Sequence, residues 1–491
     1  MASPENARRS PRAVPLTSVG APTLTTRAGG HARVWGPAVL ALVAVVVRLP
    51  MFLSTRPLSF DDGVYGASVV DMRHGLVPYR GVFASQGPLH LPLLYAGDIL
   101  GLHTIDAPRL TPLLAGVVTA LAIAASARRL GASRVAAFVA ALLVATTGTM
   151  LWTTGQITGD GPAAALTAVA VWAALVYRDE PRWWRAVLVG TLFGGALATK
   201  PIAIAAIVPL AVWLLAPRRN AHVGAAGAAI VATWLAAAVP WGLPRVWEQS
   251  IEYHRGAGPS YSHLSQLGKL VTTLATRDAA LVAAVVLGVV AARRATSARS
   301  TRNDARLLGI WLALTALVLV FEKAMFANHL AALILPLALL AAVRPPPLSW
   351  LAIALVVLVP WEAVNQRDIL WPSHIAGVDA QVVAQLRRLP HGAEAIADDP
   401  GLVWRAGLST PAQMNDTTDM RIFQGGITTG VVAAAAASPR TCAVVITPVG
   451  FGAQLQGLRA AITVVGYRLA HAYGRDRELW LRPCPGATMD R

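Results

Sequence analysis

The chain has 491 residues, of which 55% are hydrophobic and only 14% are charged. A soluble globular domain carries about 25% charged residues, and the mean hydropathy here is +0.53. The composition therefore excludes a single water-soluble domain and predicts a polytopic α-helical membrane protein. The 42 Lys and Arg residues exceed the 25 Asp and Glu residues, which gives a formal charge of +17. In a membrane protein this excess is typical of cytoplasmic loops near anionic headgroups, so we expect membrane lipids and no nucleic acid as partners.

The first segment, residues 1–33, is rich in Arg, Pro, Ser and Thr, which predicts a disordered basic tail on the cytoplasmic side. The apolar run after it is long and lacks a small-residue cleavage site, so we do not expect a cleaved signal peptide. About eleven apolar segments follow, and a membrane span needs roughly 20 apolar residues, or fewer when its ends snorkel. They lie near residues 34–53, 107–127, 135–153, 160–177, 186–199, 201–216, 222–240, 279–292, 306–321, 328–343 and 348–363.

One further stretch, GPLHLPLLYAGDILGL, is apolar but short. If it lies along the membrane surface, the loops ARRLGASR, YRDEPRWWR, PRRNAH, AARRATSARSTRNDAR and VRPPP all stay in the cytoplasm with the N-terminus. If it crosses the membrane, every one of these basic loops is inverted. We therefore expect residues 86–101 to form a juxtamembrane helix. The membrane domain then covers residues 34–364, with outer loops at residues 54–106 and 241–278.

Residues 365–491 predict a small extracytoplasmic α/β domain after the last span. VDAQVVAQLRRL has helical apolar spacing, while EAIADD, CAVVITP and ELWLRP are typical of short strands. The two cysteines of the chain, Cys442 and Cys484, have neither CxxC spacing nor a nearby His that would indicate a metal site. Outside the cytoplasm they would be able to form a disulfide. No residue of this domain stands out as catalytic.

Two adjacent acids, Asp61 and Asp62, occur in the stretch SFDDGVYG of the first outer loop. One interpretation is purely structural: an Asp, most simply Asp62, caps a helix that runs to Gly75. That interpretation leaves Asp61 available for chemistry. Adjacent carboxylates can also share a divalent cation, but no third ligand is evident, so a metal remains an open alternative.

The same topology places further ionisable groups on the outer face: Asp160 in TTGQITGD, Lys200 in ATKP, and Lys323 and His329 in FEKAMFANH. Each has a plain alternative. Asp160 would serve as a helix N-cap, Lys200 would extend from a turn toward the headgroups, and His329 would be an interfacial residue with no role. The alternative for Lys200 is less favourable, because a cation on the outer side opposes the positive-inside bias. A lipid phosphate would compensate for that charge. Arg48, near the outer end of the first span, raises the same question, and would pair with Asp61 or with the phosphate.

Several of these motifs occur in a fixed order: RLP, FDDGVY, GLVPYRG, QGPL, a segment ending in GD, GGALATK and FANH. In order and spacing, over residues 34 to about 345, the chain resembles the GT-C superfamily of integral-membrane glycosyltransferases. It is most similar to the branch with protein O-mannosyltransferases and lipid A aminoarabinose transferases. The resemblance implies transfer of a sugar from a polyprenyl-phosphate carrier to a cell-envelope acceptor, which would be a lipid, a polysaccharide or a protein, on the outer face.

The resemblance also assigns roles to residues. Asp61 matches the catalytic base of a D-E-x-x-Y pattern, Tyr65 matches its tyrosine, and Asp62 stands where Glu is common, so the predicted catalytic residues are Asp61, Asp62 and Asp160. Asp160 matches an acid near the catalytic centre. Gln86 is a departure, because relatives often have a charged residue there, and Gln cannot act as a base.

The chemistry agrees with this assignment. A phosphate carrier is already a good leaving group, so the enzyme mainly needs a base for the acceptor hydroxyl and cations for the departing phosphate. Asp61 would be the base. The residues expected to bind substrate are Arg48, Tyr65, Tyr79, Arg80, Gln86, Lys200, Lys323 and His329.

Two other classes of function remain as alternatives. A transporter or lipid flippase would use the outer charges as a gate, although transporters usually place such residues near the middle of the bilayer. A scaffold for envelope assembly would make their clustering accidental. The Ala-, Arg- and Gly-rich composition suggests a bacterial plasma membrane protein.

Overall fold

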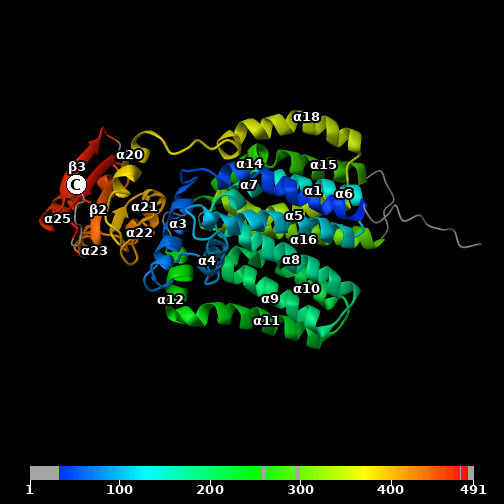
Figure 1. Cartoon of the computed structure of the whole chain (residues 1–491). Helices are drawn as coiled ribbons and strands as arrows, with labels where there is room; N and C mark the ends of the chain where they lie inside the picture. Colours follow the sequence, from blue (N-terminus) through cyan, green and yellow to red (C-terminus); the bar gives the residue numbers. More distant parts are fainter. Residues whose placement is uncertain (1–31, 257–260, 293–298, 324, 476, 485–491) are drawn as a thin grey trace, which may run out of the picture.

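The computed structural model describes residues 32–256, 261–292, 299–323, 325–475 and 477–484. Long helices form a bundle, and a small unit with a β-sheet lies at one end of it, beside α3 (Phe60–Arg73) (Figure 1). Most of the predicted N-terminal tail, residues 1–31, lies outside the described residues.

Each predicted apolar segment corresponds to a helix or to a broken pair of helices. These helices are α1 (Ala32–Val46), α5 (Leu110–Arg129), α6 (Arg134–Thr146), α7 (Gly148–Gly155), α8 (Asp160–Asp179), α9 (Trp183–Thr199), α10 (Ile207–Leu215), α11 (Asn220–Ala238), α15 (Ala279–Ala292), α16 (Arg299–Phe321), α17 (Ala331–Val343) and α18 (Leu348–Asn365).

Fewer helices than eleven meet the length of a full span. Within the described residues, five helices are long and apolar enough to cross a membrane, and two bent pairs bring this number to seven. The pair α6 and α7 bends by 58°, where Thr147 ends the first helix and caps the second. Shorter apolar helices account for other predicted segments: Gly36–Val46, Pro201–Leu215 and Ala327–Val343. Composition alone therefore predicts where the apolar helices lie, but the breaks between them depend on local capping and on proline.

The connecting elements are short apart from α4 (His90–Leu100) and α14 (His263–Arg277), and α14 forms a bent pair with α15. The short ones are α2 (Leu49–Phe52), η2 (Ala107–Arg109), η3 (Pro201–Ala206), η4 (Val239–Trp241), α12 (Leu243–Trp247), the π-helical turn η5 (Glu248–Glu252), α13 (Tyr253–Arg255), η6 (Ala327–Leu330) and α19 (Arg367–Leu370). Helix α4 lies inside the stretch 86–101 for which a helix was predicted.

The basic loops gather at one end of the bundle. Arg129 pairs with Asp179 at 2.8 Å, and Arg178 pairs with Asp304 at 3.1 Å. Asp160 begins helix α8 and Asp179 ends it, so the helix has 20 residues. Since an α-helix rises 1.5 Å per residue, the two ends of α8 are about 30 Å apart. The basic loops and Asp160 thus lie at opposite ends.

The C-terminal unit contains a four-stranded sheet in the order β1 (Glu394–Ala397), β2 (Thr441–Ile446), β4 (Arg477–Leu481) and β3 (Arg468–Tyr473). β1 and β2 are parallel, and the other neighbours are antiparallel. Three of these strands match predicted ones, whereas β3 was not predicted. The helices of the C-terminal unit are α20 (Gly377–Leu386), α21 (Pro400–Ala406), α22 (Asp419–Phe423), α23 (Thr429–Ala436), α24 (Phe451–Gln454) and α25 (Leu458–Val464).

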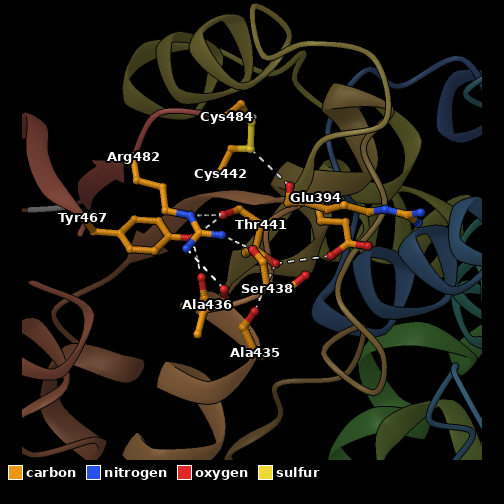
Figure 2. The surroundings of a disulfide bond; sticks show 11 residues. Glu394, Ala435, Ala436, Ser438, Thr441, Cys442, Tyr467, Arg482 and Cys484 are labelled. Carbon is orange, nitrogen blue, oxygen red and sulfur yellow. Dashed lines mark hydrogen bonds between the residues drawn. A yellow bond between two sulfur atoms is a disulfide. The ribbon is translucent and has the colours of Figure 1, made fainter. Parts of the chain in front are cut away.

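A disulfide joins Cys442 on β2 to Cys484 beyond β4, as the sequence allowed (Figure 2). Beside it, Arg482 Nε donates to the carbonyl of Thr441 at 2.8 Å, and Tyr467 Oη donates to the same carbonyl at 2.5 Å. These contacts fix the last strand against β2.

Helix α21 packs directly on α3. A Cβ added to Gly63 would lie 2.7 Å from Gly401 N, and one added to Gly66 would lie 2.2 Å from the ring of Trp404. Only glycine allows the two helices to approach this closely. The C-terminal unit is therefore part of the same packed body as the first outer loop.

Candidate active site

Asp61 lies in the first turn of α3 and its side chain is half-buried. Within the described part of the chain, its carboxylate accepts no hydrogen bond. Burial raises the pKa of Asp61 to about 6, and the charges of Lys200, Asp160, Asp416 and His329 act on it. A carboxylate with this pKa is mostly ionised at neutral pH yet basic enough to accept a proton.

Asp160 and Lys200 form a buried ion pair. Lys200 Nζ lies 2.6 Å from Asp160 Oδ2, and Asn328 Nδ2 donates to the same oxygen at 2.8 Å. The expected N-cap role of Asp160 is wrong, because Gly159 is the N-cap and Asp160 is the first helical residue. Nor does Lys200 extend to the headgroups, because it is buried against this carboxylate.

His329 is also buried, and its Nδ1 lies 2.7 Å from Glu322 Oε2. The ring of Phe326 meets it edge-on at 5.5 Å. The predicted group of Asp61, Asp160, Lys200 and His329 is thus brought together from α3, α8, the end of α9 and η6. The loop before η6 supplies Glu322 as the partner of the histidine.

A second set of side chains lines the same region. The Tyr65 hydroxyl lies 3.5 Å from Ser85 Oγ, and the Tyr65 ring meets the His90 ring edge-on at 4.6 Å. A Cβ on Gly159 would lie 3.5 Å from both Gln86 Oε1 and His90 Nδ1. Gln86 and His90 therefore converge on the backbone that leads into Asp160.

Tyr79 holds the backbone of Gln86 in place. Its hydroxyl donates to the carbonyl of Gln86 at 2.7 Å, and burial raises its pKa above the usual range. Its backbone is left-handed, with φ at 63°, and its carbonyl accepts from Gln249 Nε2 at 3.1 Å. Tyr79 positions Gln86 rather than facing the carboxylates itself.

Asp62 does not cap α3 and is not part of the reactive group. The N-cap is Ser59, whose hydroxyl accepts from Asp62 N. The fully buried Asp62 carboxylate forms an ion pair with Arg109 and accepts from the backbone N of Leu58 and Ile157, each at 2.9 Å. Although burial by itself raises its pKa, Arg109 holds the pKa of Asp62 below the usual value. Its role is to fix the start of α3.

Three predicted substrate-binding cations lie elsewhere. Arg48 is fully buried, and its Nε donates to Thr154 Oγ1 at 2.6 Å, so the expected pairing with Asp61 is wrong. Arg80 is exposed. Lys323 is exposed and donates to the carbonyl of Arg255 at 2.8 Å. The sequence placed these residues near one surface but could not show where their side chains point.

The sequence interpretation missed three residues of this site. Asn328 and His90 stand inside motifs that were considered for their neighbours, FANH and GPLH. Asp416 comes from the C-terminal unit, and its charge acts on Asp61. The local pattern MNDTTD does not indicate a role for Asp416. The residue comes near Asp61 only because α21 packs on α3.

An apolar pocket adjoins the ion pair. Asp160 lies at its wall, together with Thr167, Trp311 and Leu335 and with alanines of α8 and η3. As for metals, no group of three or more His, Cys, Asp or Glu side chains is arranged to hold an ion within the residues that the structure describes. Asp61 and Asp62 themselves point to different surroundings.

The chain is similar to known sugar-transferring enzymes. Residues 88–243 match the family model described as dolichyl-phosphate-mannose-protein mannosyltransferase. ArnT from Cupriavidus metallidurans, in its structure bound to undecaprenyl phosphate, superposes with a TM-score of 0.63 at 17% identity. The superposition covers 92% of this chain and 98% of ArnT. The chain has the GT-C fold.

A second GT-C structure agrees. The oligosaccharyltransferase of Archaeoglobus fulgidus, tethered with an acceptor peptide, gives a TM-score of 0.55 at 13% identity, over 85% of this chain and 69% of that one. Among curated proteins, no sequence match is found. The resemblance to GT-C glycosyltransferases indicated by the ordered motifs is confirmed.

Proposed function

We propose that this GT-C protein transfers a sugar from a polyprenyl-phosphate donor to a cell-envelope acceptor. The observation that carries the proposal is the half-buried carboxylate of Asp61, which has no hydrogen-bond partner in the described residues and on which the charges of the Asp160–Lys200 pair act. The donor class is supported by ArnT, whose structure holds undecaprenyl phosphate, and by the matched mannosyltransferase family.

The reaction needs one base and one group of cations. Asp61 takes the proton of the acceptor hydroxyl as its oxygen attacks the anomeric carbon of the sugar. The bond from that carbon to the phosphate oxygen breaks, and the prenyl phosphate leaves with the electron pair. Lys200, supported by Asp160, and His329 stabilise the growing negative charge.

We also propose that the site opens on the extracytoplasmic side of the plasma membrane, with the N-terminus in the cytoplasm. The basic loops at the opposite end of α8 support this orientation through the positive-inside rule. The disulfide in the C-terminal unit supports it too, because such bonds persist in oxidising compartments. In this proposal residues 34–364 form the membrane domain and residues 365–491 the outer one.

The test compares wild type, Asp61→Asn and, as a matched control, Asp419→Asn. Asp419 is an exposed acid of the C-terminal unit. Each protein is supplied with radiolabelled undecaprenyl-phosphate or dolichyl-phosphate sugars and an envelope extract, and label transfer is followed. We expect the control to match wild type and Asp61→Asn to lose about 100-fold or more, since general bases contribute this much.

Two outcomes would contradict the proposal. Equal transfer by wild type and Asp61→Asn would remove Asp61 as the base. No transfer by wild type with any donor of the panel would favour the transporter interpretation.

A further inference from the structure

The loop that follows α21, residues 410–418, is fixed to the first outer loop by side-chain hydrogen bonds. The Asn415 amide donates to Ser68 Oγ and to the carbonyl of Phe83, each at 2.9 Å, and its oxygen accepts from Phe83 N at 2.9 Å. Thr410 donates from its backbone N to Asp71 at 2.7 Å. The loop is therefore held at both ends on the wall of the site.

This anchoring brings Asp416 alongside the reactive face of α3. Asp61, Tyr65 and Ser68 are spaced by four and then three residues, so they share one face of the helix. Asn415 contacts Ser68 on that face, and the next residue is Asp416. The charge of Asp416 acts on both Asp61 and Tyr65, in agreement with this placement.

The Asp416 side chain is buried, and the wall around it is rigid. Its Oδ1 accepts from Thr418 N at 3.0 Å. Arg421 stacks on Phe83 at 4.0 Å and donates to the backbone carbonyl of Asp416 at 2.6 Å. The Tyr253 hydroxyl lies 3.0 Å from Thr418 Oγ1. The guanidinium thus binds the backbone of Asp416, and its positive charge also acts on the carboxylate, although within the described residues the two side chains form no ion pair at contact distance.

A buried carboxyl near a second carboxylate is unfavourable unless another group compensates for it. Arg421 compensates for the Asp416 charge only in part, because burial still raises the pKa of Asp416. A separate observation indicates that such a group is a bound ligand. His90 is only 1% exposed, and neither of its ring nitrogens has a hydrogen-bond partner in the described residues. The His90 ring meets Tyr65 edge-on at 4.6 Å, and its Nδ1 would lie 3.5 Å from a Cβ on Gly159, so the histidine borders the same region.

We infer that Asp416 contacts substrate, with its carboxyl accepting hydrogen bonds from hydroxyl groups of the carbohydrate held beside Asp61. Carbohydrate hydroxyls would fill the same space that His90 borders. The inference rests on the proposed function, and it makes the C-terminal unit a part of the active site. The hydroxyls would belong either to the donor sugar or to the acceptor.

The experiment uses the full chain in lipid nanodiscs and compares wild type, Asp416→Asn and the exposed control Asp419→Asn. Binding is measured for undecaprenyl phosphate alone and for undecaprenyl phosphate carrying the sugar that wild type transfers. Apparent KM is measured for the acceptor, and thermal unfolding is recorded for each variant.

Two results would support the inference. If Asp416 contacts the donor sugar, Asp416→Asn weakens binding of the sugar-bearing lipid about tenfold and leaves the sugar-free lipid unchanged. If it contacts the acceptor, both lipids bind as in wild type and the acceptor KM rises about tenfold. The control variant behaves as wild type in all measurements.

Other results would overturn it. Equal weakening of both lipids indicates a structural role, and no change in any measurement removes Asp416 from the site. If Asp416→Asn does not fold, Asp416→Glu keeps the charge but lengthens the side chain, and the same two comparisons decide. A wild type that neither binds the lipids nor transfers sugar contradicts the proposed function itself, and this inference with it.

Discussion

Asp61 and Asp62 are neighbours in sequence but have opposite surroundings. Successive residues of an α-helix point about 100° apart, so the two carboxylates leave α3 in different directions. Asp62 meets Arg109 and two backbone N–H groups in a fully buried position. Asp61 meets no hydrogen-bond donor in the described residues and is half-buried. The Asp62 carboxylate is stabilised as an anion, whereas the Asp61 carboxylate has a raised pKa.

This difference predicts how activity depends on pH. Because the pKa of Asp61 is raised to about 6, its base form is lost as the pH falls through that value. We expect kcat/KM to decline below about pH 6, tenfold for each further pH unit. A pH–rate profile measures this directly. An acid limb near pH 4, the ordinary range of a carboxyl group, would contradict the assigned environment of Asp61.

Helix α3 is the element that links the site to the C-terminal unit. Its glycines admit α21, its first turn carries Asp61, and Asp71 near its end accepts from both the backbone N and the hydroxyl of Thr410. Burial raises the pKa of Asp71 to about 8. At neutral pH the Asp71 carboxyl, which links α3 to Thr410 of the C-terminal loop, is therefore mainly protonated.

The expected consequence is a pH-dependent stability that Asp71→Asn removes. Between about pH 4 and pH 8 the folded protein holds a proton on Asp71 that the unfolded chain has lost, so the free energy of unfolding falls as pH rises. The slope from this one group is at most about 1.4 kcal/mol per pH unit. Asn resembles the protonated acid and cannot ionise.

Thermal unfolding from pH 5 to pH 8 tests this expectation. Relative to wild type, Asp71→Asn should become progressively more stable as pH rises, while the exposed control Asp419→Asn should follow wild type. A Tm difference between Asp71→Asn and wild type that does not change with pH would show that Asp71 is already ionised in the folded protein.

At the scale of the whole molecule, the charges separate along the bundle. Ion pairs join the basic loops at one end, as between Arg129 and Asp179. The Asp160–Lys200 pair and the C-terminal unit lie at the other end. A bundle of apolar helices between two polar ends is the arrangement expected of a membrane protein.

Cysteine labelling tests the proposed orientation. Val464→Cys lies on the C-terminal unit, where Val464 is 87% exposed, and Arg182→Cys lies in an exposed basic loop. In intact cells a membrane-impermeant thiol reagent should label the first and not the second, and permeabilised cells should show both. Labelling of Arg182→Cys alone in intact cells would mean that the orientation is inverted.

Sequence patterns predicted where the apolar helices lie. They also singled out Asp61, Asp160, Lys200 and His329, which the fold brings together, along with Asp62, Arg48, Arg80 and Lys323, which lie elsewhere. Hydrophobic runs and ordered motifs are local properties, and Asp61, Asp160, Lys200 and His329 stand in such motifs. The sequence also allowed the bond between Cys442 and Cys484, without requiring it.

The neighbours of those residues follow from the folded arrangement of the chain. Arg109 forms an ion pair with Asp62 away from the site, and Thr154 accepts a hydrogen bond from Arg48. The C-terminal unit brings Asp416 near Asp61. These contacts join residues from about 50 to more than 350 positions apart, and no local pattern records them. The side chain of a buried ionisable residue is placed by the partner that compensates for its loss of water, and that partner is known only when the chain has folded.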